Sequence, residues 1–529
     1  MFIVTRAGRS GRRSKPRQNA ANHAGRLWTP LPEQDPRGWS GSVWRGALFA
    51  AALGTASGPA GAPTFDFEVV FQTGDPAPGV AGTSFFGFVP APINDQGEAA
   101  LVASVTGPGV TNETFRVLGR AGSGGAFAPL IRAGDPAPGI AGATVSGFAG
   151  ASDIDNAGHT AFFASVQGSG FDETNNSVLY VQTASGLEPV LRTGAPIPGQ
   201  PPEITVAGLG RPVVNDAGDL VVTVEIDAPG VTDDNDEVVL RRTATGFEIA
   251  AREGFPVSGL PGIVLESIFG APGLDEDGTI IVNGPLQTAG PPPVSSNGLV
   301  AIGETGSAVL AQQGVTPVPD AGGAILNSVS VSAPERNATG GFVVPTSLVV
   351  GTGDATDDNA RVLVASRIGG IETVIREGDI ILGTEGGRYS RTSSGEAGIS
   401  DAGVAVARSF LEGPGVDSGN NVLLWAEGNN GPEKILRTGD MFELAPGDFR
   451  QISSIGVASA GRFVNASTQV GFVLVLGDLY LGFENLISAL VLATPIPEAA
   501  IPLLAGAWLL AAALALLWRR SISVSPPSL

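Results

Sequence analysis

The chain has 529 residues, of which 43% are hydrophobic and 15% charged, a composition that excludes a disordered chain. It contains no cysteine, which excludes disulfides, a thiol nucleophile and thiolate metal sites. The formal net charge of −21 disfavours binding to nucleic acid, because an acidic surface repels a polyanion.

Residues 1–62 are predicted to be a basic leader that ends in a signal peptide. Arg45 precedes the short apolar run 47–53, and the small residues GTASGPAGA follow it. A basic segment, an apolar segment and small residues in this order indicate an export signal, with cleavage between Ala56 and Ala62. The apolar run is too short to span a bilayer.

Residues 63–494 are predicted to form seven β-repeats of about 60 residues. A turn-rich segment recurs, first as QTGDPAPG and RAGDPAPG, and the repeats start near residues 72, 132, 192, 252, 312, 376 and 437. The spacings are 60, 60, 60, 60, 64 and 61 residues. Repeats of this length with strand-like content predict a β-propeller or a β-array.

The first repeat, 72–131, illustrates the predicted blade. Strands are expected at 83–93, 98–105, 114–118 and 126–131, separated by segments rich in Gly, Pro, Asn and Asp. Asn94 and Gly97 are typical of a tight turn between the first two strands, because Gly accepts a positive φ. Four antiparallel strands correspond to one blade of a propeller.

The turn motif recurs in each repeat, and an apolar pair follows it. Its first residues are Asn94, Asp155, Asn215, Asp275, Asn337, Ser400 and Asn465, and its fourth residues are Gly97, Gly158, Gly218, Gly278, Gly340, Gly403 and Thr468. The second repeat, Asp155-x-x-Gly158-x-x-Ala161-Phe162, resembles the bacterial NxxGxxAF tandem-repeat family most clearly. That resemblance implies an exported β-repeat protein with a C-terminal anchor, but it implies no chemistry.

The strand-like segment 65–71 precedes the first repeat and predicts how the ring closes. The last repeat has an expected third strand at 479–483 but no clear fourth strand. The segment 65–71 would supply that strand and remove an exposed sheet edge. The sequence therefore predicts an all-β, seven-bladed propeller closed by an N-terminal strand, with an open β-array as the alternative.

Residues 495–529 are predicted to be a sorting or anchor segment. The uncharged run 501–518 is long enough to form a transmembrane helix, and Arg519 and Arg520 follow it. With Pro497 and Glu498 before the run, the segment resembles the PEP-CTERM sorting signal, which implies recognition by an exosortase-type transpeptidase. Ala499 departs from the Pro-Glu-Pro pattern, and an ordinary membrane anchor is the alternative. Both interpretations place the repeats outside the cytoplasm.

Few residues of the repeats suggest catalysis. His159 is the one histidine after the leader, which limits histidine-based chemistry, and no pair of carboxylates can be nominated. The sequence therefore predicts no catalytic residue and no enzyme. An Arg near the end of most fourth strands is expected to form a salt bridge between blades, to residues such as Asp135 or Asp379.

Calcium is the one cofactor that the sequence suggests. The acidic loops contain the candidate ligands Asp233, Asp234, Asp236, Asp357 and Asp358. Hard cations bind such oxygen ligands, although solvated hairpin loops have the same composition.

The predicted role is structural or adhesive, with binding of extracellular-matrix polysaccharide at the cell envelope. The predicted partners are the sorting transpeptidase, the bacterial membrane and matrix polysaccharide, without nucleic acid. The alternative is a carboxylate-dependent enzyme that acts on extracellular polysaccharide.

Overall fold

The computed structural model describes residues 65–496, apart from 289–293, 305, 330–336, 368–369, 459–461 and 478–485. The predicted leader 1–62 and the predicted helix 501–518 with its flanking motifs lie outside this range. No helix in the described part is long and apolar enough to cross a membrane.

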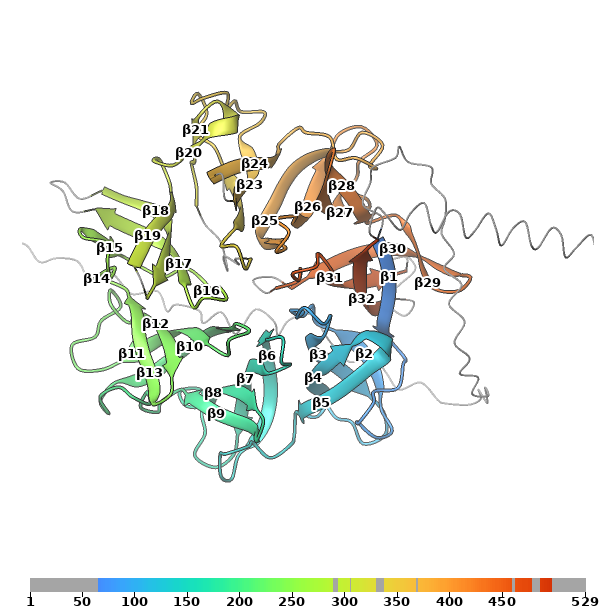
Figure 1. Cartoon of the computed structure of the whole chain (residues 1–529). Helices are drawn as coiled ribbons and strands as arrows, with labels where there is room; N and C mark the ends of the chain where they lie inside the picture. The colour runs from blue at the N-terminus through green and yellow to red at the C-terminus, as the bar shows by residue number, and fades with distance from the viewer. Residues whose placement is uncertain are drawn as a thin grey trace, which may run out of the picture. The chain divides into compact units, whose positions relative to one another are not determined.

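The described residues form seven antiparallel sheets around a central axis, which are the blades of a β-propeller, and one separate two-stranded sheet (Figure 1). Blade 1 contains β2 (Ser84–Phe88), β3 (Ala99–Thr106), β4 (Arg116–Gly122) and β5 (Ala126–Arg132). Blade 2 contains β6 (Thr144–Ile154), β7 (Thr160–Gln167), β8 (Ser177–Thr183) and β9 (Gly186–Arg192). Blade 3 contains β10 (Thr205–Val214), β11 (Leu220–Asp227), β12 (Glu237–Thr243) and β13 (Gly246–Arg252).

Blades 4 and 5 have less regular inner strands. In blade 4, the short strands β15 (Ile263–Leu265) and β16 (Gly273–Leu274) both pair with β17 (Ile280–Thr288). β18 (Val294–Gly303) and β19 (Gly306–Gln312) follow, and β14 (Phe255–Pro256) pairs with β15. Gly270 and Pro272 separate β15 from β16, and neither suits the middle of a strand. Blade 5 contains β22 (Phe342–Ser347), β23 (Arg361–Arg367) and β24 (Gly370–Arg376), with the short pair β20 (Pro317–Val318) and β21 (Ala324–Ile325) before them.

Blades 6 and 7 complete the ring. Blade 6 contains β25 (Arg388–Ile399), β26 (Ala405–Glu412), β27 (Val422–Gly428) and β28 (Gly431–Arg437). Blade 7 contains β30 (Asp448–Val457), β31 (Val470–Leu476), β32 (Ile487–Pro495) and β1 (Phe65–Gln72), and β29 (Met441–Ala445) pairs with β30. Each predicted repeat start is the last residue of a fourth strand, such as Gln72 in β1 and Arg132 in β5.

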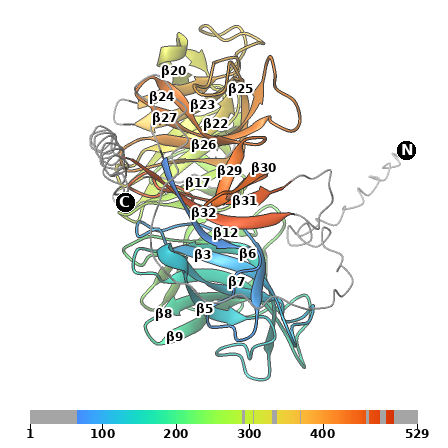
Figure 2. The ribbon, with the colours of Figure 1, turned by 90° about the vertical axis from the view of Figure 1, so that its right-hand side faces the viewer.

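The two ends of the described chain meet in blade 7, where β1 pairs antiparallel with β32 (Figure 2). The register joins Phe65 to Pro495 and Gln72 to Ala489. This pairing is the N-terminal strand closure that the sequence predicts. The predicted third strand was wrong: β32 at 487–495 takes that place, and 479–483 lies outside the described residues. The apolar run ISALVLAT gives β32 a buried face on each side.

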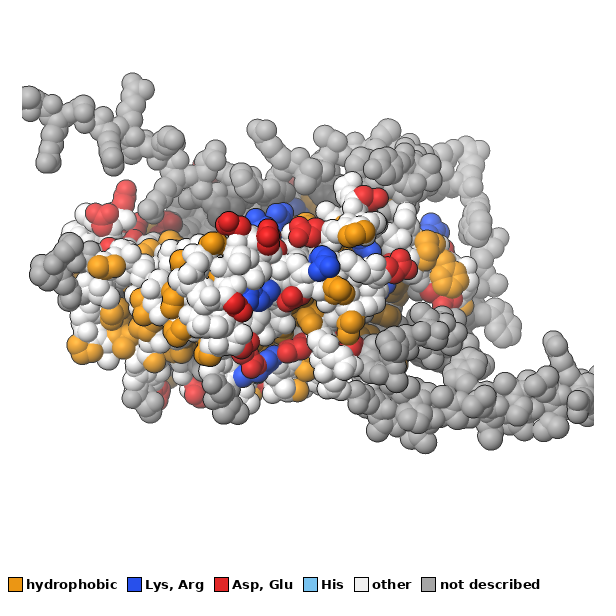
Figure 3. Space-filling model, turned by 90° about the horizontal axis from the view of Figure 1, so that it is seen from above, with side chains coloured by type: hydrophobic (Ala, Val, Ile, Leu, Met, Phe, Trp, Pro, Cys, Tyr) orange, Lys and Arg blue, Asp and Glu red, His pale blue; other side chains and the backbone are white. Residues whose placement is uncertain are grey.

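The hydrophobic core consists of seven clusters, and each fills the space between two neighbouring blades. Successive residues of a strand point to opposite faces, so one strand contributes to two clusters. In β4, Val117 packs in the cluster shared with blade 7, whereas Leu118 packs in the cluster shared with blade 2. Both faces of each sheet are therefore buried, and this supports a cysteine-free fold of this size. On the rim in Figure 3, acidic and basic side chains lie interspersed with hydrophobic ones.

Candidate functional site

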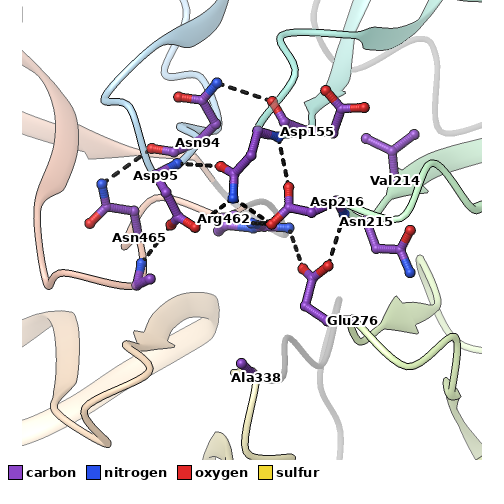
Figure 4. Close-up of polar contacts among 12 residues, drawn as sticks. Asn94, Asp95, Asp155, Val214, Asn215, Asp216, Glu276, Ala338, Arg462 and Asn465 are labelled. Carbon is purple, nitrogen blue, oxygen red and sulfur yellow. Dashed lines mark hydrogen bonds and ion pairs between the residues drawn. The ribbon is translucent and has the colours of Figure 1, made fainter.

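The recurring turn motif forms a polar ring at one end of the central axis (Figure 4). Asn94 is fully buried, and its Oδ1 accepts hydrogen bonds from the backbone N–H groups of Gln96 and Glu98. Its Nδ2 donates to the carbonyl of Asp155 in the next blade, at 3.0 Å. One side chain thus shapes its own turn and joins two blades. Gly97 has φ 73°, which explains the glycine in the motif.

The same link between blades recurs where the motif begins with Asn. Asn215 donates to the carbonyl of Asp275 at 2.9 Å, and Asn337 donates to that of Ser400 at 2.8 Å. Asn465 of blade 7 donates to the carbonyl of Asn94 at 3.2 Å and so closes the ring. The motif Asn that the sequence singles out is therefore an interblade contact.

The second motif residue forms a parallel set of links, in which its side chain accepts from the backbone of the preceding blade. The donor–acceptor distances are 2.6–2.9 Å. Ala466 N donates to Asp95 Oδ1, Asp95 N to Asn156 Oδ1, Asn156 N to Asp216 Oδ1, Asp216 N to Glu276 Oε2 and Ala338 N to Asp401 Oδ1. These bonds are charge-assisted wherever the acceptor is a carboxylate, which makes them stronger than neutral ones.

A cavity of about 60 Å³ lies inside this ring. Arg462 extends into it from blade 7, with Nη1 3.9 Å from Asp216 Oδ2 and Nη2 3.6 Å from Glu276 Oε1. Burial raises the pKa of the Asp153 carboxyl despite the nearby guanidinium groups of Arg462 and Arg211. Burial also raises the pKa of Glu276. Ligand pockets usually enclose about 300–1,000 Å³, so this cavity has room for ordered water rather than for a substrate.

A larger polar groove of about 250 Å³ lies between blades 5 and 6. We call it the blade 5–6 groove. Its lining combines five hydroxyl side chains, a tyrosine, a proline and two guanidinium groups and contains no carboxylate: Ser328, Thr346, Ser347, Thr392, Ser394, Tyr389, Pro345, Arg361 and Arg391. Thr346 and Ser347 end β22, on the side of the blade away from the polar ring, so the groove and the ring are separate sites.

The repeat pattern is broken in both blades that flank this groove, at Thr346 in its lining and at the buried Ser409 beneath it. The ninth residue after the first motif residue is apolar or Gly in five blades, namely Ala103, Ala164, Val224, Gly284 and Leu474. In blades 5 and 6 it is Thr346 and Ser409. β25 also contains the largest bulge among the described strands. Thr392 pairs with Ser409 and Ala397 pairs with Ala407, so five steps along β25 match only two steps along β26. Bulges are common beside functional sites, where they redirect side chains.

A buried chain of polar groups leads to the floor of the groove. Trp425 Nε1 donates to Ser409 Oγ at 2.8 Å, and Ser409 Oγ lies 2.6 Å from Thr392 Oγ1. The Tyr389 hydroxyl donates to the same Thr392 oxygen at 3.2 Å. Burial raises the pKa of Tyr389 to about 12, so this hydroxyl keeps its proton at neutral pH. The chain thus ends at Thr392, a residue that lines the groove.

The calcium candidates lie in loops at the blade ends. Asp233, Asp234, Asp357 and Asp358 are exposed, and Asp236 is half-buried. Within the described residues, no three acidic or histidine side chains converge in a way that would hold a metal ion. Loop amides hold these turns instead: Asn235 Oδ1 accepts from Thr232 N, and Asn359 Oδ1 accepts from Thr356 N. Calcium binding there stays a prediction.

Blade 3 contains an acidic group at the base of one of these loops. Glu253 is buried and its Oε2 accepts from the backbone N–H of Glu237. Burial, together with the carboxylates of Glu237 and Asp236, raises the pKa of Glu253 to about 7. At the matching place in blade 5, Glu377 forms an ion pair with Arg361.

The recurring Arg does not bridge blades as expected. Arg132 Nε donates to the carbonyl of Thr114 at 2.7 Å, and Arg252 Nε donates to that of Asn235 at 2.9 Å, both within one blade. Asp135 and Asp379 instead accept from the backbone N–H groups of Arg132 and Arg376 and close the turn. Because Asp135 accepts from the backbone of the turn, the guanidinium group of Arg132 bonds to a loop carbonyl instead.

The remaining predicted residues contribute little to either site. His159 Nδ1 lies 2.9 Å from Asp155 Oδ2, and the imidazole is half exposed. Pro497, Glu498, Arg519 and Arg520 lie outside the described residues. Sequence reasoning missed the blade 5–6 groove, although the 64-residue spacing and the run RYSRTSS from Arg388 were available signals.

Comparisons with solved structures return enzymes among proteins of similar fold. A PL25 ulvan lyase has a TM-score of 0.36 and 13% identity, over 75% of this chain and 92% of its own. The β-propeller domain of the trilobed protease from Pyrococcus furiosus has a TM-score of 0.38 and 11% identity, over 74% and 93%. The polysaccharide lyase Uly1 has a TM-score of 0.37 and 12% identity, over 75% and 88%. We take no site residue from these scores.

These structures correct one sequence-based prediction. We expected that the protein is not an enzyme, but the solved structures similar to it include two polysaccharide lyases and a protease. No curated protein matches the chain. A family model matches residues 54–186 and 143–499, nearly the whole repeat region. The chain belongs to this family, DUF7453, a family of unknown function.

Proposed function

We propose that the protein is an exported propeller that binds extracellular polysaccharide, with the blade 5–6 groove as its binding site. The observation that carries this proposal is the change from apolar or Gly to Thr346 and Ser409 in the two blades that flank the groove. Both side chains are hydrogen-bonded, Thr346 to the carbonyl of Ser328 and Ser409 to Trp425 and Thr392, so these substitutions place a connected set of polar groups at the groove.

The groove suits a segment of a sugar chain in its chemistry and in its openness to solvent. Its volume of about 250 Å³ is four times that of the central cavity, and it is open to solvent. A short segment of a polymer can therefore lie in it while the rest of the chain extends outward. Hydroxyl and guanidinium groups can hydrogen-bond to sugar hydroxyl and ring oxygens.

The proposed location rests on the two ends of the sequence. A signal peptide within 1–62, the apolar run 501–518 and the terminal Arg pair support export and attachment to the envelope. We propose that an exosortase-type enzyme recognises the segment 495–529. Fractionation of cells that express the full chain, compared with a chain ending at 496, tests this. Equal release of both forms into the medium would contradict it.

Binding is tested directly by titrating neutral and acidic matrix polysaccharides into the full-length protein. Thr346→Val restores the apolar pattern of the repeat but removes the bond to the Ser328 carbonyl, so we expect weaker binding, with circular dichroism confirming that the variant folds. Thr223→Val in blade 3 is the matched control, which removes a hydroxyl far from the groove and should leave affinity unchanged. Equal binding by wild type and Thr346→Val would contradict the groove as the site.

The same samples are assayed for shortened products. Release of oligosaccharides that Thr346→Val reduces would identify the protein as an enzyme that acts at this groove. Binding without products would identify a binder.

A further inference from the structure

We propose, on the basis of the proposed polysaccharide binding, that the blade 5–6 groove selects sugars that carry a carboxylate or sulfate, held by Arg391 and the Thr392 hydroxyl. The two anionic groups share one chemistry, since both present several acceptor oxygens and a negative charge.

Arg391 is available for an anion. Its side chain is exposed, and its guanidinium carbon lies 4.6 Å from the ring centroid of Phe410. Within the described part of the chain, no carboxylate pairs with it. Arg361, the other guanidinium group in the groove, is paired with Glu377. Stacking on an aromatic ring holds the guanidinium plane and leaves its in-plane N–H groups free for a ligand.

The directions of the hydrogen bonds in the buried polar chain indicate whether the Thr392 hydroxyl can donate to a ligand in the groove. Trp425 and Tyr389 are donors in their bonds to Ser409 and Thr392. One proton bridges Ser409 and Thr392, and either hydroxyl can supply it. Ser409 is fully buried, and a buried hydroxyl proton without an acceptor is costly. The favoured arrangement has Ser409 donating to Thr392, so the Thr392 proton is directed to a group in the groove.

The charge around the groove supports an anionic ligand. The chain has 51 acidic and 30 basic Lys or Arg residues, so most of its surface repels anions. The groove lining has two arginines and no acidic residue. The positive charge of the groove attracts an anionic sugar, while the negative charge of the remaining surface repels other polyanions.

The test uses oligogalacturonate, its carboxyl-reduced form and chondroitin sulfate, titrated into the full-length protein. We expect Arg391→Gln to weaken binding of at least one of the two anionic probes about 10- to 100-fold, the loss typical of one charged hydrogen bond. Arg388→Gln, on the same strand but outside the groove lining, should bind as wild type does. Tighter binding of chondroitin sulfate than of desulfated chondroitin, which keeps the carboxylates, would assign the site to a sulfate.

The outcomes separate this inference from the proposed function. Binding of the carboxyl-reduced probe alone would overturn the inference and leave polysaccharide binding intact. Unchanged affinity of Arg391→Gln for both anionic probes would also overturn it. Absence of binding to every polysaccharide would overturn both. Thr392→Ser keeps the hydroxyl and should bind as wild type, whereas Thr392→Val should bind more weakly, with circular dichroism confirming that both variants fold.

Discussion

The polar ring and the blade 5–6 groove use the same kinds of side chain in opposite ways. In the ring, the Asn side chains bond to their own turn and to the next blade, and little hydrogen-bonding capacity is left. In the groove, Arg391 has no carboxylate partner among the described residues, and we propose that the Thr392 hydroxyl donates to a ligand. The comparison teaches that the repeated polar residues hold the ring together, whereas residues that break the repeat are candidates for function.

The largest effect is expected from removing the strand that closes the ring. A chain without residues 65–72 loses the partner of β32 and the buried side chains of Val70 and Phe71, which alone contribute roughly 3–6 kcal/mol. We expect its melting temperature to fall by more than about 10 °C or its folding to fail. A chain that begins at residue 63 is the control. Equal thermal melting of the two forms would contradict ring closure.

Breaking one link of the ring should have the next largest effect. Asn94→Ala leaves the carbonyl of Asp155 and the amides of Gln96 and Glu98 without their partner. We expect a loss of about 2–4 kcal/mol in the free energy of unfolding, measured by denaturant titration. Asn175→Ala, in an exposed loop, should cost less than about 1 kcal/mol. A similar loss for both variants would show that the ring has no special role.

The acidic group of blade 3 predicts a dependence of stability on pH. The pKa of Glu253 is about 7 in the folded protein, above the ordinary 4.5, so the folded state binds the proton more tightly than the unfolded state. The contribution of Glu253 to stability is therefore present below pH 4.5 and is lost as pH rises through 7. Glu253→Gln should raise the melting temperature at pH 8 by removing the buried charge, with little change at pH 5.

Blade 5 provides the control for Glu253. Glu377 occupies the matching place but is paired with Arg361, so Glu377→Gln should lower or leave unchanged the melting temperature at pH 8. If both variants shift the melting curve in the same direction, the cause assigned to Glu253 is wrong.

The smallest effect on stability is expected in the groove. Arg391 is exposed, so Arg391→Gln should change the free energy of unfolding by less than about 0.5 kcal/mol in denaturant titration. A loss above about 2 kcal/mol would show that Arg391 is structural and would remove the contrast with the ring.

The sequence predicts the architecture better than the sites. The 60-residue period and the Asn/Asp-x-x-Gly turns identify the blades, because each turn motif acts within a few residues. The closing strand follows from counting strands. The third strand of blade 7 was misplaced, because the apolar run 487–495 lies next to the predicted tail and no turn motif marks it.

The sites depend on contacts between blades, which no local pattern encodes. Asn94 and Asp155 are 61 positions apart, and the groove brings Thr346 of blade 5 together with Thr392 of blade 6. The predicted salt bridges between blades were wrong for a local reason: Asp135 accepts from the backbone N–H of Arg132 and closes the turn. A repeat alignment that searches for broken positions would have found Thr346 and Ser409.

The most direct test measures melting temperature and polysaccharide affinity together for Asn94→Ala and Arg391→Gln. The account predicts opposite results: Asn94→Ala melts at a lower temperature but binds as wild type does below its transition, whereas Arg391→Gln melts as wild type does and loses affinity. If Arg391→Gln binds normally while folded Asn94→Ala loses affinity, the ligand site belongs to the polar ring. That result would contradict the account that repeated polar residues hold the ring together and that residues breaking the repeat bind the ligand.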